Sequence, residues 1–228
     1  MSGSPAPGGR RRVEVAPERL ARWLDNWAAR HGAVATRVTP EAVTFTGADG
    51  GVVRCEVPFP PLAFDGASAD SPVDLPGLEA APLLAHVSCE RTVAVLLARR
   101  GGHAVGVFQG RRLVASKVGR RLVHGRSAAG GWSQHRFERR RENQAREALK
   151  AAAADMARVL EPWQDRLDAV VTGGERGALA ALANDPRLAP LLARAEHRVL
   201  PLPNPRRAVL EEAPDRYRAV VIELEEPA

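Results

Sequence analysis

Residues 92–118, TVAVLLARRGGHAVGVFQGRRLVASKV, decide the fold of the larger part of this chain. The segment holds three apolar runs, at 92–98, 103–108 and 113–118, and the turn sequences Arg-Arg-Gly-Gly and Gln-Gly separate them. Short apolar runs bounded by glycine-containing turns are typical of strands joined as hairpins. The sequence therefore predicts a meander of three antiparallel strands.

The sequence that follows the meander alternates between helical and strand-like segments. The expected elements are a long helix at about 136–160, a strand at 167–171, helices at 175–183 and 186–195, and short strands at 197–200 and 217–224. Three strands followed by a helix, a strand, a helix and a strand predict an α/β fold. In such a fold helices flank a mixed sheet, as in ribonuclease-H-like domains.

The N-terminal part of the chain has a different composition and predicts a separate module. Residues 1–12 combine glycine, proline and serine with arginine, and we expect a disordered tail there. A helix should begin at Pro17, because proline is favoured at the first helical position, and it should end at Gly32. Strands are expected at 33–38, 42–46 and 51–57.

Domain limits follow from these patterns. Residues 58–80 are rich in proline and predict a linker or an extended arm. We therefore expect a small α+β module with its linker over residues 13–80, and the α/β domain over residues 81–228. The first helix also carries an apolar stripe, which predicts core packing and leaves a docking face for a protein partner as the alternative. Its residues are Leu20, Trp23, Leu24 and Trp27.

Positive charge is concentrated in about one quarter of the chain. The net charge is +6, whereas residues 91–150 alone hold fifteen Lys or Arg against three acidic residues. Such a concentration predicts a polyanionic partner such as nucleic acid. No apolar run is long enough to span a bilayer and no secretory signal is recognised, so we expect no membrane partner and a cytoplasmic location. Cys55 and Cys89 lack metal-ligand spacing and are expected to be reduced, buried thiols.

The most basic part of this region surrounds a glycine-rich loop. Residues 119–134 read GRRLVHGRSAAGGWSQ, and an arginine-dense helix follows at once. Glycine allows the backbone to approach a target closely, and arginine attracts phosphate. We therefore expect the loop to enter a crowded polyanionic site, with arginines along RNA phosphates. These residues are Arg120, Arg121, Arg126, Arg136, Arg139, Arg140 and Arg141.

The residue content argues against several enzyme classes. A two-metal nuclease needs converging carboxylates, but residues 91–150 contain no Asp, and their three Glu lie in the arginine-dense helix. A serine hydrolase of the nucleophile-elbow kind needs Gly-x-Ser-x-Gly, which the chain lacks. His103, His124 and His135 lack metal-ligand spacing, and we interpret each as a polar strand or loop residue. We expect no metal and no small-molecule cofactor.

The end of the loop, Gly130-Gly131-Trp132-Ser133-Gln134, resembles the Gly-Gly-Gln loop of archaeal and eukaryotic class I release factors. Its wider spacing is closer to that of the Vms-like release factors. The chain resembles their stand-alone actinobacterial branch, whose members are described as peptidyl-tRNA hydrolases. The resemblance covers about residues 90–225, through the strand order, the loop, the glutamine and the basic helix.

The resemblance implies a role for the loop and a set of partners. It implies that Gln134 is the catalytic glutamine and that Gly130 and Gly131 form its hinge. It also implies ribosome quality control, in which the protein releases a stalled nascent chain by cleaving the ester that joins it to the tRNA. The implied partners are peptidyl-tRNA and the large ribosomal subunit at its peptidyl-transferase centre.

The chemistry of glutamine limits what this residue can do. Glutamine does not titrate, so it cannot be a general base, but its backbone N–H can bond the departing ribose oxygen while its side chain orients a water. One such donor is worth roughly 2.7–4 kcal/mol, so the rest of the catalysis must come from the ribosomal site. The alternative is a non-enzymatic RNA- or ribosome-binding factor in which Gln134 is only structural.

Overall fold

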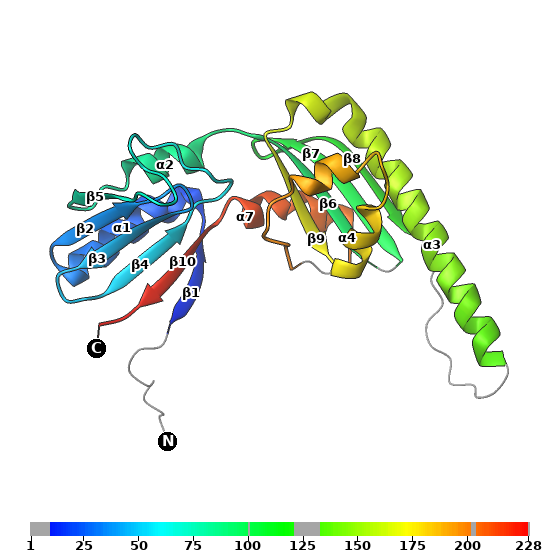
Figure 1. Ribbon diagram of the computed structural model, residues 1–228, viewed down its shortest axis with the longest axis horizontal. Coiled ribbons are helices and arrows are strands. Elements are labelled where there is room, and N and C mark those ends of the chain that lie inside the picture. Colours follow the sequence, from blue (N-terminus) through cyan, green and yellow to red (C-terminus); the bar gives the residue numbers. More distant parts are fainter. Residues whose placement is uncertain (1–9, 100, 121–132, 202–203, 228) are drawn as a thin grey trace, which may run out of the picture. The chain divides into compact units, whose positions relative to one another are not determined.

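The chain forms two compact units, which Figure 1 colours along the sequence. The first unit comprises Met1–Cys89 together with Tyr217–Ala228, and the second unit comprises Glu90–Arg216. For residues 133–142 the backbone alone is described. The computed structural model describes residues 10–99, 101–120, 133–201 and 204–227.

The first unit is built on a six-stranded antiparallel sheet with the strand order β1-β10-β4-β3-β2-β5. Two helices, α1 and α2, contribute buried residues to the core cluster that they share with this sheet. The bounds are β1 Arg11–Val15, α1 Pro17–His31, β2 Val34–Val38, β3 Ala42–Gly47, β4 Val52–Glu56, β5 Val73–Pro76, α2 Ala81–Ser88 and β10 Val220–Glu225. The predicted first helix and the three strands that follow it are confirmed.

The apolar stripe of α1 forms the centre of the first unit's core. Leu20, Leu24 and Trp27 are buried, and Trp23 is partly buried against the same cluster. These residues recur at helical spacing, so they line the face of α1 that packs on the sheet. The stripe is therefore core, and the alternative of a partner-docking face is wrong.

Three segments of the first unit differ from expectation. Residues 11 and 12 were expected in a disordered tail, but they belong to β1, where Arg11 pairs with Leu224. The expected linker contains β5, which pairs with β2 at the edge of the sheet. The last strand was expected in the larger domain, but β10 lies between β1 and β4 because its apolar residues fill the first unit's core. Residues 1–9 lie outside the described residues. Cys55 is buried as expected, whereas the expectation for Cys89 is wrong, because it is exposed at the end of α2.

The second unit contains a four-stranded sheet in the order β8-β7-β6-β9. Its strands are β6 Thr92–Arg99, β7 Gly102–Gln109, β8 Arg112–Arg120 and β9 Ala169–Gly174. The pairs β6–β7 and β7–β8 are antiparallel, which confirms the predicted meander, and β9 runs parallel to β6. The mixed sheet with its helices confirms the α/β class, and the ribonuclease-H-like assignment stays a prediction.

Helices cover both faces of this sheet. On one face, small and aliphatic residues of the long helix α3, among them Ala152, Ala153 and Met156, share a core cluster with the sheet and with α4 and α5. On the other face, the two terminal methyl groups of Leu210 in α6 lie within 3.2 Å of the position that a Cβ on Gly106 would occupy. The bounds are α3 Ser133–Leu160, a 3-10 helix Glu161–Arg166, α4 Arg176–Leu182, α5 Ala189–Ala193, α6 Arg207–Glu211 and α7 Ala213–Tyr217.

The expected strand at 197–200 is reduced to an isolated bridge. Leu200 pairs in parallel with Gly173 of β9, and Ala195 pairs with Val170. These single contacts extend the sheet beyond β9 without forming a ladder. The division between the units falls between residues 89 and 90, so α2 belongs to the first unit although residues 81–228 were expected to form one domain.

Gly174 generates a stability prediction for the second unit. Its φ is 107°, and a Cβ at this position would overlap the carbonyl oxygen of Ala98 in β6. We expect Gly174→Ala to destabilise the second unit by more than about 2 kcal/mol, because both the backbone conformation and the pairing of β6 with β9 are strained. Chemical denaturation followed by circular dichroism measures the loss.

Gly177→Ala is the matched control for this variant. No heavy atom lies within 4 Å of its Cβ position, and alanine is favoured over glycine inside a helix such as α4. The control should unfold at the wild-type denaturant concentration or above it. Equal midpoints for the two variants would contradict the overlap at Ala98.

The first unit generates a prediction about pH. The backbone N–H of Gly51 donates to Asp49 at 3.0 Å, and Nδ1 of His31 lies 2.8 Å from the same carboxylate. These bonds, the one from Gly51 first, lower the pKa of Asp49. A carboxyl whose pKa is lower in the folded state contributes stability at neutral pH that is lost as the pH falls through that folded pKa.

The unperturbed pKa of an aspartate side chain is about 4. We therefore expect the first unit to lose part of its stability through Asp49 as the pH falls from about 5 to about 2. Asp49→Asn should flatten that part of the profile, whereas Asp25→Asn, at an exposed position on α1, should leave it unchanged. Thermal unfolding at a series of pH values measures the difference. Parallel profiles for wild type and Asp49→Asn would rule out the contribution.

Candidate functional site

The predicted catalytic loop connects β8 to α3. β8 ends at Arg120, and α3 begins at Ser133, three residues earlier than the sequence predicts. Gln134 therefore lies in the first turn of α3, where the backbone N–H groups have no partner within the helix. Gly130, Gly131 and the intervening Trp132 lie outside the described residues.

The predicted RNA-binding arginines are described to different extents. Arg120 is exposed at the end of β8, which is an edge strand of its sheet. Arg121 and Arg126 lie outside the described residues. The remaining arginines lie on the first turns of α3, where the backbone alone is described: Arg136, Arg139, Arg140 and Arg141. The structure therefore brings Arg120 to the beginning of the loop and the α3 arginines to its end.

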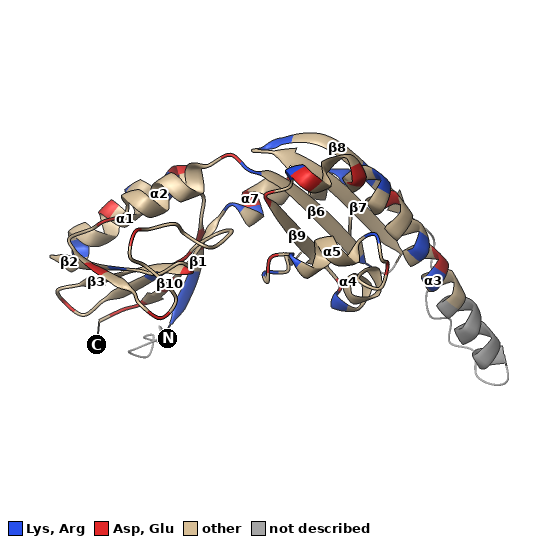
Figure 2. Cartoon of the chain, turned by 45° about the horizontal axis from the view of Figure 1, so that its top comes forward, with Lys and Arg blue, Asp and Glu red and all other residues tan. Residues whose placement is uncertain are grey.

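Charge near the loop differs between the two elements that bound it. β8 carries Arg112, Lys117 and Arg120 and no acidic residue. In the described side chains of α3, basic and acidic residues alternate along the helix, as Figure 2 shows. Within that part of the chain, β8 is the more uniformly basic element, which suits contact with phosphate.

His103 connects the sheet to α3 beside the end of β8. Its Nε2 lies 3.1 Å from Oδ2 of Asp155 in α3, and its side chain is 8% exposed. In the adjoining strand Gly119 pairs directly with His103, and a Cβ on Gly119 would overlap the imidazole ring. The glycine that begins the predicted loop sequence thus makes room for a histidine.

Sequence reasoning missed this contact, although His103 was interpreted correctly as a strand residue. Its partner is 52 residues away, so no local spacing indicates the pair. A signal was present in the alternation of β7, because His103 shares a face with Val105 and Val107 and so points into the core side. A buried histidine in such a row needs a polar partner. His124 lies outside the described residues, and of His135 only the backbone is described.

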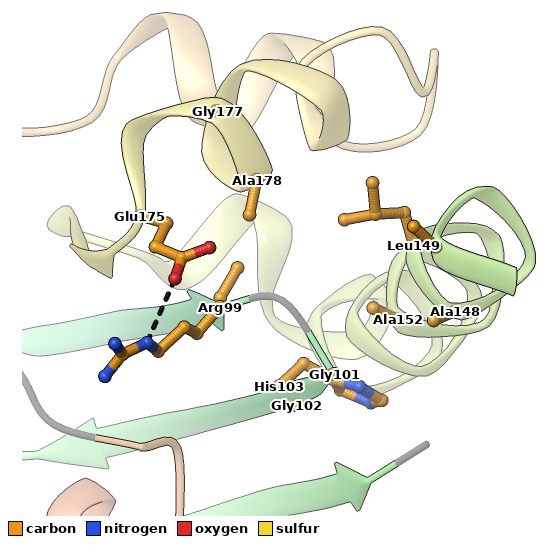
Figure 3. A pocket seen from close by; sticks show the side chains of 12 residues that line it. Arg99, Gly101, Gly102, His103, Ala148, Leu149, Ala152, Glu175, Gly177 and Ala178 are labelled. Atoms are coloured by element: carbon orange, nitrogen blue, oxygen red, sulfur yellow. Dashed lines mark hydrogen bonds and ion pairs between the residues drawn. The ribbon is translucent and has the colours of Figure 1, made fainter. Parts of the chain in front are cut away.

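A pocket of about 250 Å³ lies between α3, the first turn of α4 and the hairpin that joins β6 to β7. Figure 3 shows Ala148, Leu149 and Ala152 of α3 on one side of it and Gly177 and Ala178 of α4 on the other, with His103 below. At its margin Nε of Arg99 donates to Glu175 at 3.0 Å. The lining is mostly small and apolar, so the packing between α3 and α4 is incomplete here.

Within the described residues, no group of three His, Cys, Asp or Glu side chains is placed to hold a metal ion. None of the helices within the described ranges has the length and apolar character needed to cross a membrane. What this part of the chain contributes is a rigid sheet and a long helix that hold the two ends of the loop.

Comparison with known proteins identifies the family to which the chain is similar. The model of the Actinobacteria/chloroflexi VLRF1 release factor family matches residues 91–223. None of the curated proteins matches the chain. Among solved structures, the archaeal translation termination factor aRF1 is 14% identical with a TM-score of 0.43, over 87% of this chain and 69% of that one. A second archaeal protein is 13% identical with a TM-score of 0.40, over 88% of this chain and 70% of that one.

The family match spans the whole second sheet, the loop and α3, and it extends into β10. It confirms the resemblance to the actinobacterial branch of the Vms-like release factors that the Gly-Gly-x-x-Gln sequence and the basic helix indicated. Since the matched residues make up more than half of the chain, this protein belongs to the Actinobacteria/chloroflexi VLRF1 release factor family.

Proposed function

We propose that this protein is a peptidyl-tRNA hydrolase that releases stalled nascent chains from the ribosome. Its family supports a release-factor role in translation, with the ribosome and tRNA as partners. The observation that carries the finer proposal is the place of Gln134, in the first turn of α3 and three residues after Gly131. The proposed site of action is the peptidyl-transferase centre of the large subunit in the cytoplasm, during ribosome quality control.

The position of Gln134 suits the chemistry of ester cleavage. A first-turn backbone N–H is free to donate outside the helix, so that of Gln134 can bond the ribose oxygen as it leaves. The side-chain amide can orient the attacking water, which it does without gaining or losing a proton. Gly130 and Gly131 act as the hinge that lets the backbone approach the ester.

The length of α3 would let its first turn reach a substrate that lies deep inside a narrow binding site. Within the described side chains, burial in α3 begins at Ala152, which is 19 residues after Ser133. At 1.5 Å per residue, the first turn stands roughly 28 Å along the helix from that contact. Figure 1 shows α3 running past the edge of its sheet, so the loop is carried at the end of a projecting helix.

Arginines along both elements would hold this projection against RNA. Arg120 on β8 and the arginines of the first turns of α3 lie at the two ends of the loop. Guanidinium groups bind phosphate oxygens in pairs of hydrogen bonds, so they orient a loop as well as attract it. They need no base contact, which suits a factor that acts on ribosomes whatever the message.

Changes at Gln134 test the catalytic role. Gln134→Ala removes the side chain and keeps the backbone N–H, whereas Gln134→Pro removes both, and proline fits the first turn of a helix. We expect peptide release from peptidyl-tRNA on large subunits to fall about 10²-fold in the alanine variant and further in the proline variant. Binding to the subunits should be retained.

Gln144→Ala, on the same helix, is the matched control and should release peptide like wild type. Single-turnover release and sedimentation of the protein with subunits separate chemistry from binding. If Gln134→Ala and wild type release peptide equally, or neither releases it, the protein is the non-enzymatic ribosome-binding factor instead.

Salt dependence tests the phosphate contacts. We expect the affinity for large subunits to fall steeply as salt rises, because bound phosphates release counterions. Arg120→Ala should lower the slope of log affinity against log salt by about one, and it should weaken binding at low salt. Arg187→Ala is the control, since Arg187 lies between α4 and α5 and its guanidinium is paired with Asp185 at 2.8 Å. A slope that Arg120→Ala leaves unchanged would remove this arginine from the interface.

A further inference from the structure

His103 lies where β7, β8 and α3 meet, and β8 and α3 are the two elements that bound the proposed loop. It belongs to β7, it lies against Gly119 one residue before the end of β8, and it bonds Asp155 of α3 at 3.1 Å. His103 is the first residue of a core-facing row in β7 that continues with Val105 and Val107. An aliphatic residue there would pack without needing a polar partner, so the imidazole is present for its bond rather than for burial.

The remaining contacts around this point determine the direction of α3 only weakly. The helix meets the sheet through Ala152, Ala153 and Ala157, whose methyl groups allow close approach but do not interlock deeply. The larger buried side chains of this contact, Met156 and Leu160, follow Asp155 in the chain and so lie on the side away from the loop. Towards the loop, Ala145, Ala148 and Leu149 of α3 line the 250 Å³ pocket, and of these three Leu149 also packs against the core cluster. Within the described side chains, the pair formed by His103 and Asp155 is therefore the directional contact between α3 and the sheet near the pocket.

The length of α3 magnifies any error in its direction. Gln134 is 21 residues from Asp155, or about 30 Å along the helix at 1.5 Å per residue. A tilt of about 2° about this point moves the first turn by about 1 Å over that length. A displacement of about 1 Å is enough to cost on the order of 10²-fold in rate when reacting groups must be aligned.

We propose that His103 is a positioning residue, which locks the direction of α3 through Asp155 and Gly119 and so places Gln134 for ester cleavage. The proposal rests on the proposed hydrolase function for its effect on catalysis, but the lock itself is a property of the free protein. Arg158 also lies near Asp155, at 3.6 Å, but it is on the same helix and so it cannot tie α3 to the sheet.

Three variants test the lock. His103→Leu removes the bond and replaces the imidazole with an apolar side chain of similar size, and His103→Gln supplies an N–H donor that can face Asp155. Gly119→Ala removes no polar group but displaces the imidazole, because its Cβ would overlap the ring. Arg158→Ala and Gly177→Ala are the controls, the first for charge at Asp155 and the second for an added methyl group without a neighbour within 4 Å.

The first measurement needs no substrate. Spin labels on cysteines placed at exposed Lys117 of β8 and exposed Asn143 of α3 report the direction of the helix, in a background where the exposed Cys89 is replaced by Ser. Pulsed electron paramagnetic resonance should give a narrow distance distribution for wild type, His103→Gln and both controls. The distribution should broaden or shift for His103→Leu and Gly119→Ala, with the folded state verified by thermal unfolding.

The second measurement is peptide release at saturating protein. We expect the single-turnover rate constant for release to fall at least about 10-fold in His103→Leu and Gly119→Ala and to recover in His103→Gln. The affinity of all three variants for large subunits should stay within about twofold of wild type. Unchanged distances in His103→Leu and Gly119→Ala would overturn the lock, and changed distances with unaltered release would overturn its role in positioning. If wild type releases no peptide, the proposed function fails, and the distance measurement still decides the lock.

Discussion

The close contact between α3 and the four-stranded sheet is the constraint on which the rest of the second unit depends. Alanines at 152, 153 and 157 bring the helix near the sheet, and Met156 and Leu160 fill the space between them. Among the described side chains of α3, those in this contact belong to the C-terminal half of the helix, and the other half extends past the sheet towards the loop. The small side chains bring α3 close to the sheet but do not fix the direction of the helix axis. We infer that the polar pair of His103 and Asp155 fixes that direction.

The described residues near the loop join the sheet to the helices that pack on it. In the described ranges no metal cluster is present, and the polar pairs nearest the loop join structural elements to one another. The proposed hydrolase function would rely on one glutamine, on a water and on groups that surround the substrate on the ribosome. The demand on the protein is then mechanical, because the glutamine must arrive in the right place at the end of a long helix.

The sheet of the first unit and strand β8 of the second unit differ in how their charges are paired. On the sheet of the first unit, Arg12 pairs with Glu56 at 3.1 Å, Arg37 with Asp74 at 2.7 Å and Arg54 with Glu223 at 3.9 Å. Exposed pairs of this kind add little stability, but they cancel positive charge that would otherwise attract phosphate. β8 in the second unit carries three basic residues and no acid. Attraction to RNA is therefore expected from the second unit, and the first unit gains its cohesion from the apolar core around Trp27 and Phe45.

Local patterns in the sequence determined the meander of β6, β7 and β8, the helices α1 and α3, and the basic surroundings of the loop. These features depend on periodicity and turn residues within a few positions, which a single sequence displays. Only the tertiary structure decided that β10 joins β1 and β4, that β5 closes an edge of the first sheet, and that His103 meets Asp155. Those contacts join residues from 35 to more than 200 positions apart. They are chosen by which apolar faces and polar groups remain to be covered once the local elements have formed.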